Sequence, residues 1–157
     1  MTAASIKGQI LENVAARLAT ITQVNGYSTD VKKVYSDRIP MGIELRKDQV
    51  PCIFLIDAPD NITMQHSCVR GDWDMRLQLW HNSGIGDIIM MDFVRNVFKA
   101  IYANSPTAAT EQHFRGIHAS IYELIPLSIS PDLNMIEANR IIELTFLVRY
   151  STQLYNL

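Results

Sequence analysis

The side chains best suited to chemistry are gathered in residues 66–81. His66, Cys68, Asp72, Asp74 and His81 lie there, and imidazole, thiolate and carboxylate groups all bind zinc. Asp72 and Asp74 are two residues apart, so on a strand they would share a face and could act as an acid–base pair. Their spacing matches no compact metal motif, so we expect a solvated hairpin without a metal or catalytic site. The alternative is a small ligand-binding or hydrolytic domain that uses His66, Cys68, Asp72 and Asp74.

A second motif, Gly84–Gly86, precedes an expected helix and is similar to a phosphate-binding turn. It lacks the third glycine of a dinucleotide fingerprint and the Gly-Lys-Ser/Thr of a P-loop. Ser28, Ser67 and Ser83 have no nucleophile-elbow context. The sequence therefore predicts a protein that is not an enzyme and needs no cofactor.

Composition narrows the class of protein further. A chain of 157 residues fits one domain with its own core. Because 48% of the residues are hydrophobic and only 19% are charged, we expect a partner chain to cover part of the apolar surface. The net charge of −2 argues against a dedicated nucleic-acid binder. Cys52 and Cys68 fit no disulfide framework, and we expect neither a signal peptide nor a membrane span.

The first half of the chain predicts one helix and two strands. Ser5 is a suitable N-cap, and Asn25-Gly26 is a suitable helix terminator. The helical spacing between them is carried by Ile6, Ile10, Val14, Leu18 and Ile21. Val31–Tyr35 is a short strand whose Lys32 and Lys33 suggest a sheet edge. Residues 37–50 indicate a loop, and the apolar run at residues 51–57 indicates a strand buried on both faces.

The second half predicts a strand, a helix and two more strands. Residues 72–81 alternate, with Trp73, Met75, Leu77 and Leu79 on one face. Residues 62–70 could pair with them as a partly exposed arm, although residues 57–71 also suit a long loop. A helix begins at Asp87, and its expected buried stripe is Ile88, Met91, Val94, Phe98 and Ile101, with Met90 also filling the core. Strands follow over residues 117–126, stopping at Pro126, and over residues 139–150, with a loop at residues 126–134 between them.

This order of elements predicts the fold class. Helix, strands, helix, strands without a regular βαβ alternation indicates an α+β fold, with a mainly antiparallel β-sheet and two helices packed on one face. We expect a single domain over residues 1–157, with a projecting hairpin or loop at about residues 57–72.

The order of these segments and their amino-acid sequences together resemble the bacteriophage tail terminator family, also called tail completion or minor tail U-like proteins. The resemblance is carried by "NGYSTDVKKVY", "PCIFLID", "WDMRLQLWH", "IGDIIMMDFVRNVFKAIY" and "FLVRYST". It implies a structural protein of the virion, made in the host cytoplasm, that forms a homo-oligomeric ring, typically a hexamer. The ring caps the head-proximal end of the tail tube, stops tube polymerisation and joins the head connector, with DNA only as cargo in the channel. Another tail or neck component is a further alternative.

The resemblance also gives individual residues expected roles. A closed ring needs one patch on each subunit to meet a different patch on the next, and an edge strand suits such a patch. The candidates for the ring interface or lumen are Val31, Lys32, Lys33, Val34, Arg46 and Lys47. The candidates for contacts with tube or connector subunits are Met64, Arg70, Asp132 and Leu133.

Overall fold

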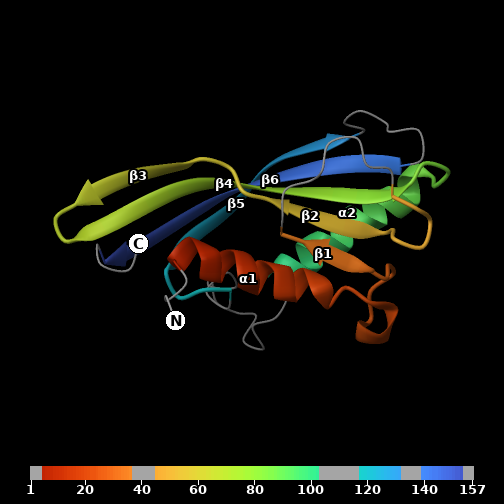
Figure 1. Ribbon diagram of the computed structural model, residues 1–157, viewed down its shortest axis with the longest axis horizontal. Helices are drawn as coiled ribbons and strands as arrows, with labels where there is room; N and C mark the ends of the chain where they lie inside the picture. Colours follow the sequence, from red (N-terminus) through yellow and green to blue (C-terminus); the bar gives the residue numbers. More distant parts are fainter. Residues whose placement is uncertain (1–4, 37–44, 103–116, 132–138, 154–157) are drawn as a thin grey trace.

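The computed structural model of the protein describes residues 5–36, 45–102, 117–131 and 139–153. Two α-helices lie against one long, twisted sheet (Figure 1). The elements in chain order are α1 (Ile6–Ala19), η1 (Gln23–Asn25), β1 (Lys33–Tyr35), β2 (Cys52–Ile56), β3 (Asp60–Gln65), β4 (Cys68–Asn82), α2 (Asp87–Tyr102), β5 (Ile121–Pro131) and β6 (Asn139–Gln153).

The sheet is built around two long central strands. β4 and β6 pair antiparallel from Cys68 and Gln153 to Asn82 and Asn139. The strand order is β1-β2-β4-β6-β5, and β3 also pairs with β4. β1 runs parallel to β2, whereas the other strand pairs are antiparallel. The predicted α+β fold with a mainly antiparallel sheet is confirmed.

The main core lies between the sheet and the two helices. Trp73, Met75, Leu77 and Leu79 alternate along β4, and each is fully buried toward this side. Buried side chains of α1 and α2, such as Val14 and Phe93, belong to the same cluster. The period-2 pattern of the strand and the period-3.6 pattern of the helices therefore meet at one face of the sheet, as the sequence predicts.

The opposite face carries a second, smaller core over β1, β2 and the neighbouring parts of β4 and β6. Its members are Leu45, Val50, Cys52, Phe54, Trp80 and Ile141, with Tyr35 packed against them. Burial there raises the pKa of the Cys52 thiol to about 12, so this cysteine stays protonated. Residues 45–50, part of the expected loop, thus supply core side chains.

Helix α1 begins at its predicted N-cap but ends earlier than predicted. The Ser5 hydroxyl accepts a hydrogen bond from the Gly8 amide at 3.1 Å, which confirms the predicted N-cap. The helix ends at Ala19, before the expected Asn25-Gly26 terminator. Those two residues close η1 instead, where Gly26 has the left-handed φ of 82°. The turn signal was correct, but it belongs to the short helix that follows.

Two expected loops are strands in the structure. Residues 60–73 form a hairpin in which β3 and β4 are joined by His66 and Ser67. The partly exposed arm expected for residues 62–70 is therefore confirmed, and the long loop considered for residues 57–71 is wrong. Pro126 does not end β5, because an edge strand tolerates a residue without an amide hydrogen. Residues 117–120 form turns rather than the start of this strand.

The buried face of α2 is rotated from the expected one. Met90, Phe93, Val94 and Val97 are buried, whereas Ile88 is 79% exposed and Met91 is 51% exposed. Apolar residues occupy more than one face of this helix, so periodicity alone did not identify the face that meets the sheet. The expectation that Ile88 and Met91 fill the core is wrong.

Candidate interaction surfaces

The possible metal ligands of residues 66–81 are separated by the length of β4. Cys68 begins the strand and His81 lies next to its end. At roughly 3.3 Å per residue, thirteen residues of strand span about 43 Å. Within residues 5–36, 45–102, 117–131 and 139–153, no three His, Cys, Asp or Glu side chains are close enough to share a metal ion.

One carboxylate of this stretch, that of Asp72, takes part in ion pairing. Asp72 lies 3.4 Å from the Arg149 guanidinium, which also binds Glu123 at 2.6 Å. The hydrogen bond from Arg149 to Glu123 and their charge attraction raise the pKa of the Arg149 guanidinium. Asp72 and Glu123 are therefore both held by the same arginine side chain.

His81 is a half-buried histidine on the helix-facing end of β4. Its Nδ1 accepts a hydrogen bond from the Asn82 amide at 2.8 Å, and its ring lies edge-on to Phe93 at 6.3 Å between centroids. Burial lowers the pKa of the imidazole from its ordinary 6.5. The folded protein thus holds His81 neutral at a pH where the unfolded chain is already protonated.

This difference predicts a pH effect on stability. The unfolded state binds more protons on His81 below about pH 6.5, so stability is present above that pH and falls as the solution becomes more acidic. Denaturant titrations between pH 5 and pH 8 should show that His81→Gln loses less free energy of unfolding at acid pH than the unchanged protein does. His66→Gln, at the exposed hairpin turn, is the control for the histidine-to-glutamine change itself. If the free energy of unfolding depends on pH equally in all three proteins, the lowered pKa of His81 is contradicted.

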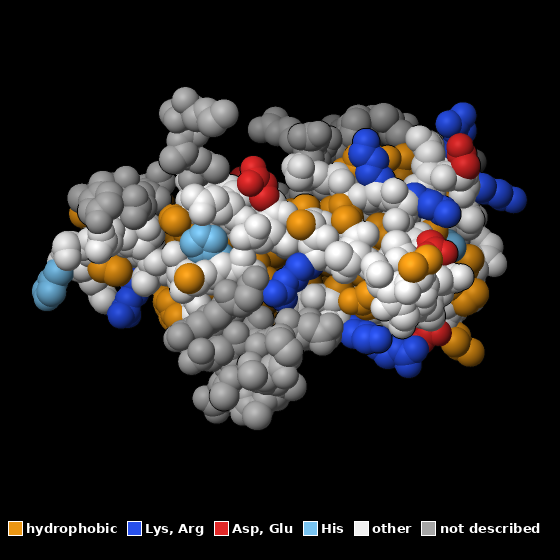
Figure 2. Space-filling view, turned by 90° about the horizontal axis from the view of Figure 1, so that it is seen from below, with side chains coloured by type: hydrophobic (Ala, Val, Ile, Leu, Met, Phe, Trp, Pro, Cys, Tyr) orange, Lys and Arg blue, Asp and Glu red, His pale blue; other side chains and the backbone are white. Residues whose placement is uncertain are grey.

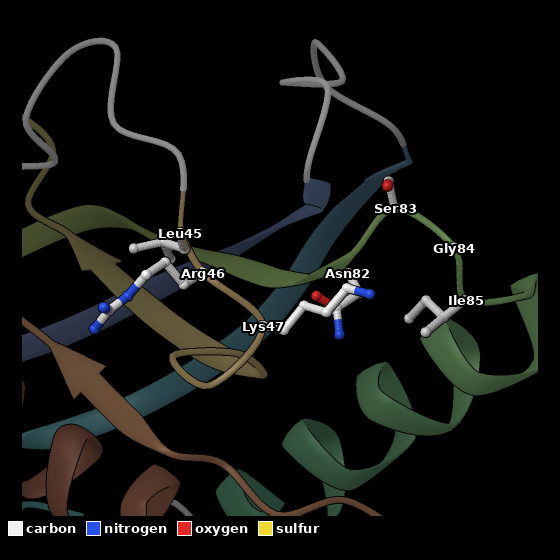
Figure 3. Close-up of a pocket in the computed structure, with 7 residues that line it drawn as sticks. All are labelled: Leu45, Arg46, Lys47, Asn82, Ser83, Gly84 and Ile85. Atoms are coloured by element: carbon white, nitrogen blue, oxygen red, sulfur yellow. The ribbon is translucent and has the colours of Figure 1, made fainter.

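A pocket of about 700 Å³ lies beside the end of β4 that carries His81 and Asn82 (Figure 3). Arg46 and Lys47 line it on one side, and Asn82–Ile85 line it on the other. Arg46 is strongly exposed and 3.4 Å from Asp48. A side chain at Gly84 or Gly86 would meet nothing within 4 Å, so these glycines are not required by a close backbone approach. Asp87 in the first turn of α2 pairs with Arg140, so the pocket lacks the features of a built phosphate site.

The β1 edge presents the two adjacent lysines. Both are exposed, and Lys33 Nζ lies 4.8 Å from the Tyr35 ring centroid. That ring stacks on Phe54 at 4.6 Å, so the edge is fixed to the second core. Among the other interface candidates, Val31 is buried in the main core and Val34 packs against it. These two valines therefore support β1 from the core side.

The β5 edge, on the opposite side of the sheet, is different in character. Tyr122, Leu127 and Ile129 are exposed apolar side chains on it. The register of β5 against β6 shifts at Tyr122 and again at Leu127. Pro126 and Pro131 also interrupt its row of amide donors. This edge therefore offers apolar side chains more readily than backbone hydrogen bonds.

The β3–β4 hairpin extends the sheet beyond the helices and forms an arm (Figure 1). Met64 is 63% exposed on it and Ile62 is 55% exposed. Arg70 lies over the Tyr122 ring at 5.9 Å from its centroid. Of the other tube or connector candidates, Asp132 and Leu133 lie outside the described residues. Figure 2 shows apolar side chains at both ends of the long axis on the side that carries α1.

Sequence inspection missed a close contact at the root of this arm. The Tyr150 ring lies over Gly71, and its hydroxyl donates to the Asp60 carboxylate. Burial and the neighbouring Asp60 raise the pKa of the Tyr150 hydroxyl, so it remains a donor. A glycine inside an alternating strand was the available signal, because such a residue often marks a close approach.

Comparison with models of known protein families finds no match, and neither does comparison with curated protein sequences. None of the described helices is long and apolar enough to cross a membrane.

Proposed function

We propose that this chain is a structural protein of phage tail assembly, a tail terminator that forms a ring on the head-proximal end of the tail tube. The proposal starts from the ordered sequence blocks that resemble this family, and the α+β fold is compatible with it. The partners are further copies of the chain, the tail tube protein and the head connector. Such a protein works in the virion and carries out no reaction.

The two unlike sides of the sheet are the observation that carries the proposal. At one edge of the sheet, Lys33 lies on β1 and Lys32 directly precedes it. At the other edge, β5 presents Tyr122, Leu127 and Ile129. A ring closes when each subunit places one patch against a different patch of the next subunit. The aliphatic stems of lysines can cover apolar side chains while their charged ends stay in water. We place β1 of one subunit against β5 of its neighbour.

The rest of the molecule then has a direct role in capping. Once the β1 and β5 sides are used within the ring, the ring can meet the tube and the connector through other surfaces. The arm, with exposed Met64 and Arg70, is the most extended of these (Figure 1). A protein of net charge −2 has no large excess of cations to hold DNA, which suits a channel through which DNA passes as cargo.

Charge reversal on β1 provides the test. Lys33→Glu should lower the fraction of rings several-fold in native mass spectra and leave uncapped tube ends in electron micrographs. Lys99→Glu is the matched control, because Lys99 Nζ likewise lies 5.0 Å from a tyrosine ring centroid, that of Tyr27 on α2's side of the molecule. The control should form rings and cap tubes normally. An unchanged protein that stays monomeric and never joins tube ends would disprove the proposed function.

A further inference from the structure

β3 is an edge strand without the usual obstacles to pairing. Its register against β4 runs from Asp60–Trp73 to Gln65–Cys68 without a bulge. Residues 61–65 contain no charged residue and no proline. Each of these five residues is exposed, and in the described part of the chain β3 pairs only with β4. Its outer backbone donors and acceptors are therefore presented to solvent in a form that suits a further strand.

The other two edges of the sheet are protected in ways that β3 is not. β1 has only three residues in the ladder and carries lysine, and β5 has two register shifts and two prolines. Short length, lysine, bulges and proline are the devices that discourage pairing between sheet edges. Strand addition is thus favoured at β3 over β1 and β5.

The side chains of β3 complement a second copy of the same strand. If two copies pair antiparallel about a two-fold axis through Thr63, Ile62 faces Met64 of the other copy and Asn61 faces its Gln65. Apolar residues then meet apolar residues, amides meet amides and the two threonines meet at the axis. Arg70, the β4 neighbour of Thr63, lies over Tyr122 on the other side of the arm. It is therefore directed away from the contact.

We infer that β3 is a self-association site, through which two copies of this protein join their arms into one continuous antiparallel sheet. The contact is isologous, because the same strand is used by both copies. It is distinct from the β1–β5 contact of the proposed ring and does not depend on it. A two-fold contact can join two free chains, or two rings, without using either of the ring-forming edges.

Substitutions at Thr63 test the axis directly. Thr63→Lys places two like charges opposite each other, and so does Thr63→Glu. Like-charge juxtaposition at an interface costs several kcal/mol, so each variant should need at least about a tenfold higher concentration to dimerise. Mixing the two variants should restore the dimer, because lysine then faces glutamate. Thr63 is exposed, so neither substitution places a charge in the core of the protein.

Sedimentation velocity over a concentration series measures the result, with circular dichroism as the check on folding. Ser128→Lys, at an exposed position on β5, is the control and should leave β3-mediated dimers intact. The inference is overturned if the unchanged protein shows no two-fold species, if Thr63→Lys self-associates normally, or if the mixture fails to recover. Binding of β3 only to a strand of the tube protein would also overturn it. Ring formation reports separately on the proposed function, because the ring contact is placed on β1 and β5 and Thr63 is on neither strand.

Discussion

Gly71→Ala is expected to lower the free energy of unfolding by about 3 kcal/mol, combining overpacking with the loss of a buried hydrogen bond. A β-carbon at this position would lie 2.4 Å from Cζ of Tyr150, well inside contact distance. The ring is buried and its hydroxyl is held by Asp60, so it cannot move aside without leaving that carboxylate unpaired. Urea denaturation followed by tryptophan fluorescence measures the change.

Two companion variants separate this clash from a general effect of alanine. Gly84→Ala should change stability by less than about 0.5 kcal/mol, because a β-carbon there meets nothing within 4 Å. In a Tyr150→Ala background the ring is absent, so adding Gly71→Ala should cost far less than it does alone. An undiminished cost in that background would show that the Tyr150 ring is not the obstacle.

Asn139→Ala is expected to cost about 3 kcal/mol, because it leaves a buried amide and a buried carbonyl without their partner. The Asn139 side chain is fully buried; its Oδ1 accepts from the Leu45 amide at 2.9 Å and its Nδ2 donates to the Leu45 carbonyl at 3.1 Å. This pair of bonds fixes residues 45–50 over the second core, where Leu45 and Val50 are buried.

The stability lost in Asn139→Ala should be local to residues 45–50 as well as global. Hydrogen exchange is expected to speed up in residues 45–50 before it does so in β4, since the second core would open first. Asn82→Ala is the matched control, because Asn82 is the register partner of Asn139 on β4 but is only half-buried. If exchange speeds up equally in residues 45–50 and in β4, the role assigned to the two hydrogen bonds between Asn139 and Leu45 is contradicted.

The arm shows why some of the sequence-based expectations failed. Residues 61–65 alternate only weakly, because both faces of β3 are exposed and burial imposes little selection on them. Their polar composition therefore left a loop and a hairpin arm both open, and pairing with β4 decided for the arm. The buried face of α2 was predicted wrongly for the opposite reason. Apolar residues lie on several faces of this helix, so only its packing against the sheet determined that Met90 and Phe93 are buried.

The same reasoning applies to the candidate residues. Their chemical types were evident from the sequence, but the 15-residue length of β4, which separates His66 from His81, depends on its full pairing with β6. The contacts of Gly71 with Tyr150 and of Leu45 with Asn139 join residues far apart in the chain, and no local pattern specifies such a pair.

The sequence by itself determined what local physics controls: the Ser5 cap, the helical period of α1, the alternation of β4 and β6, and hence the α+β class. The tertiary structure alone decided which strands became edges, because an edge is defined by the absence of a neighbour on one side. Among the described residues, it placed β1 and β5 on opposite edges of the sheet and gave the outer edge of β3 no partner strand. Hydrophobic pattern records whether a side chain is buried, whereas strand order depends on contacts between distant segments.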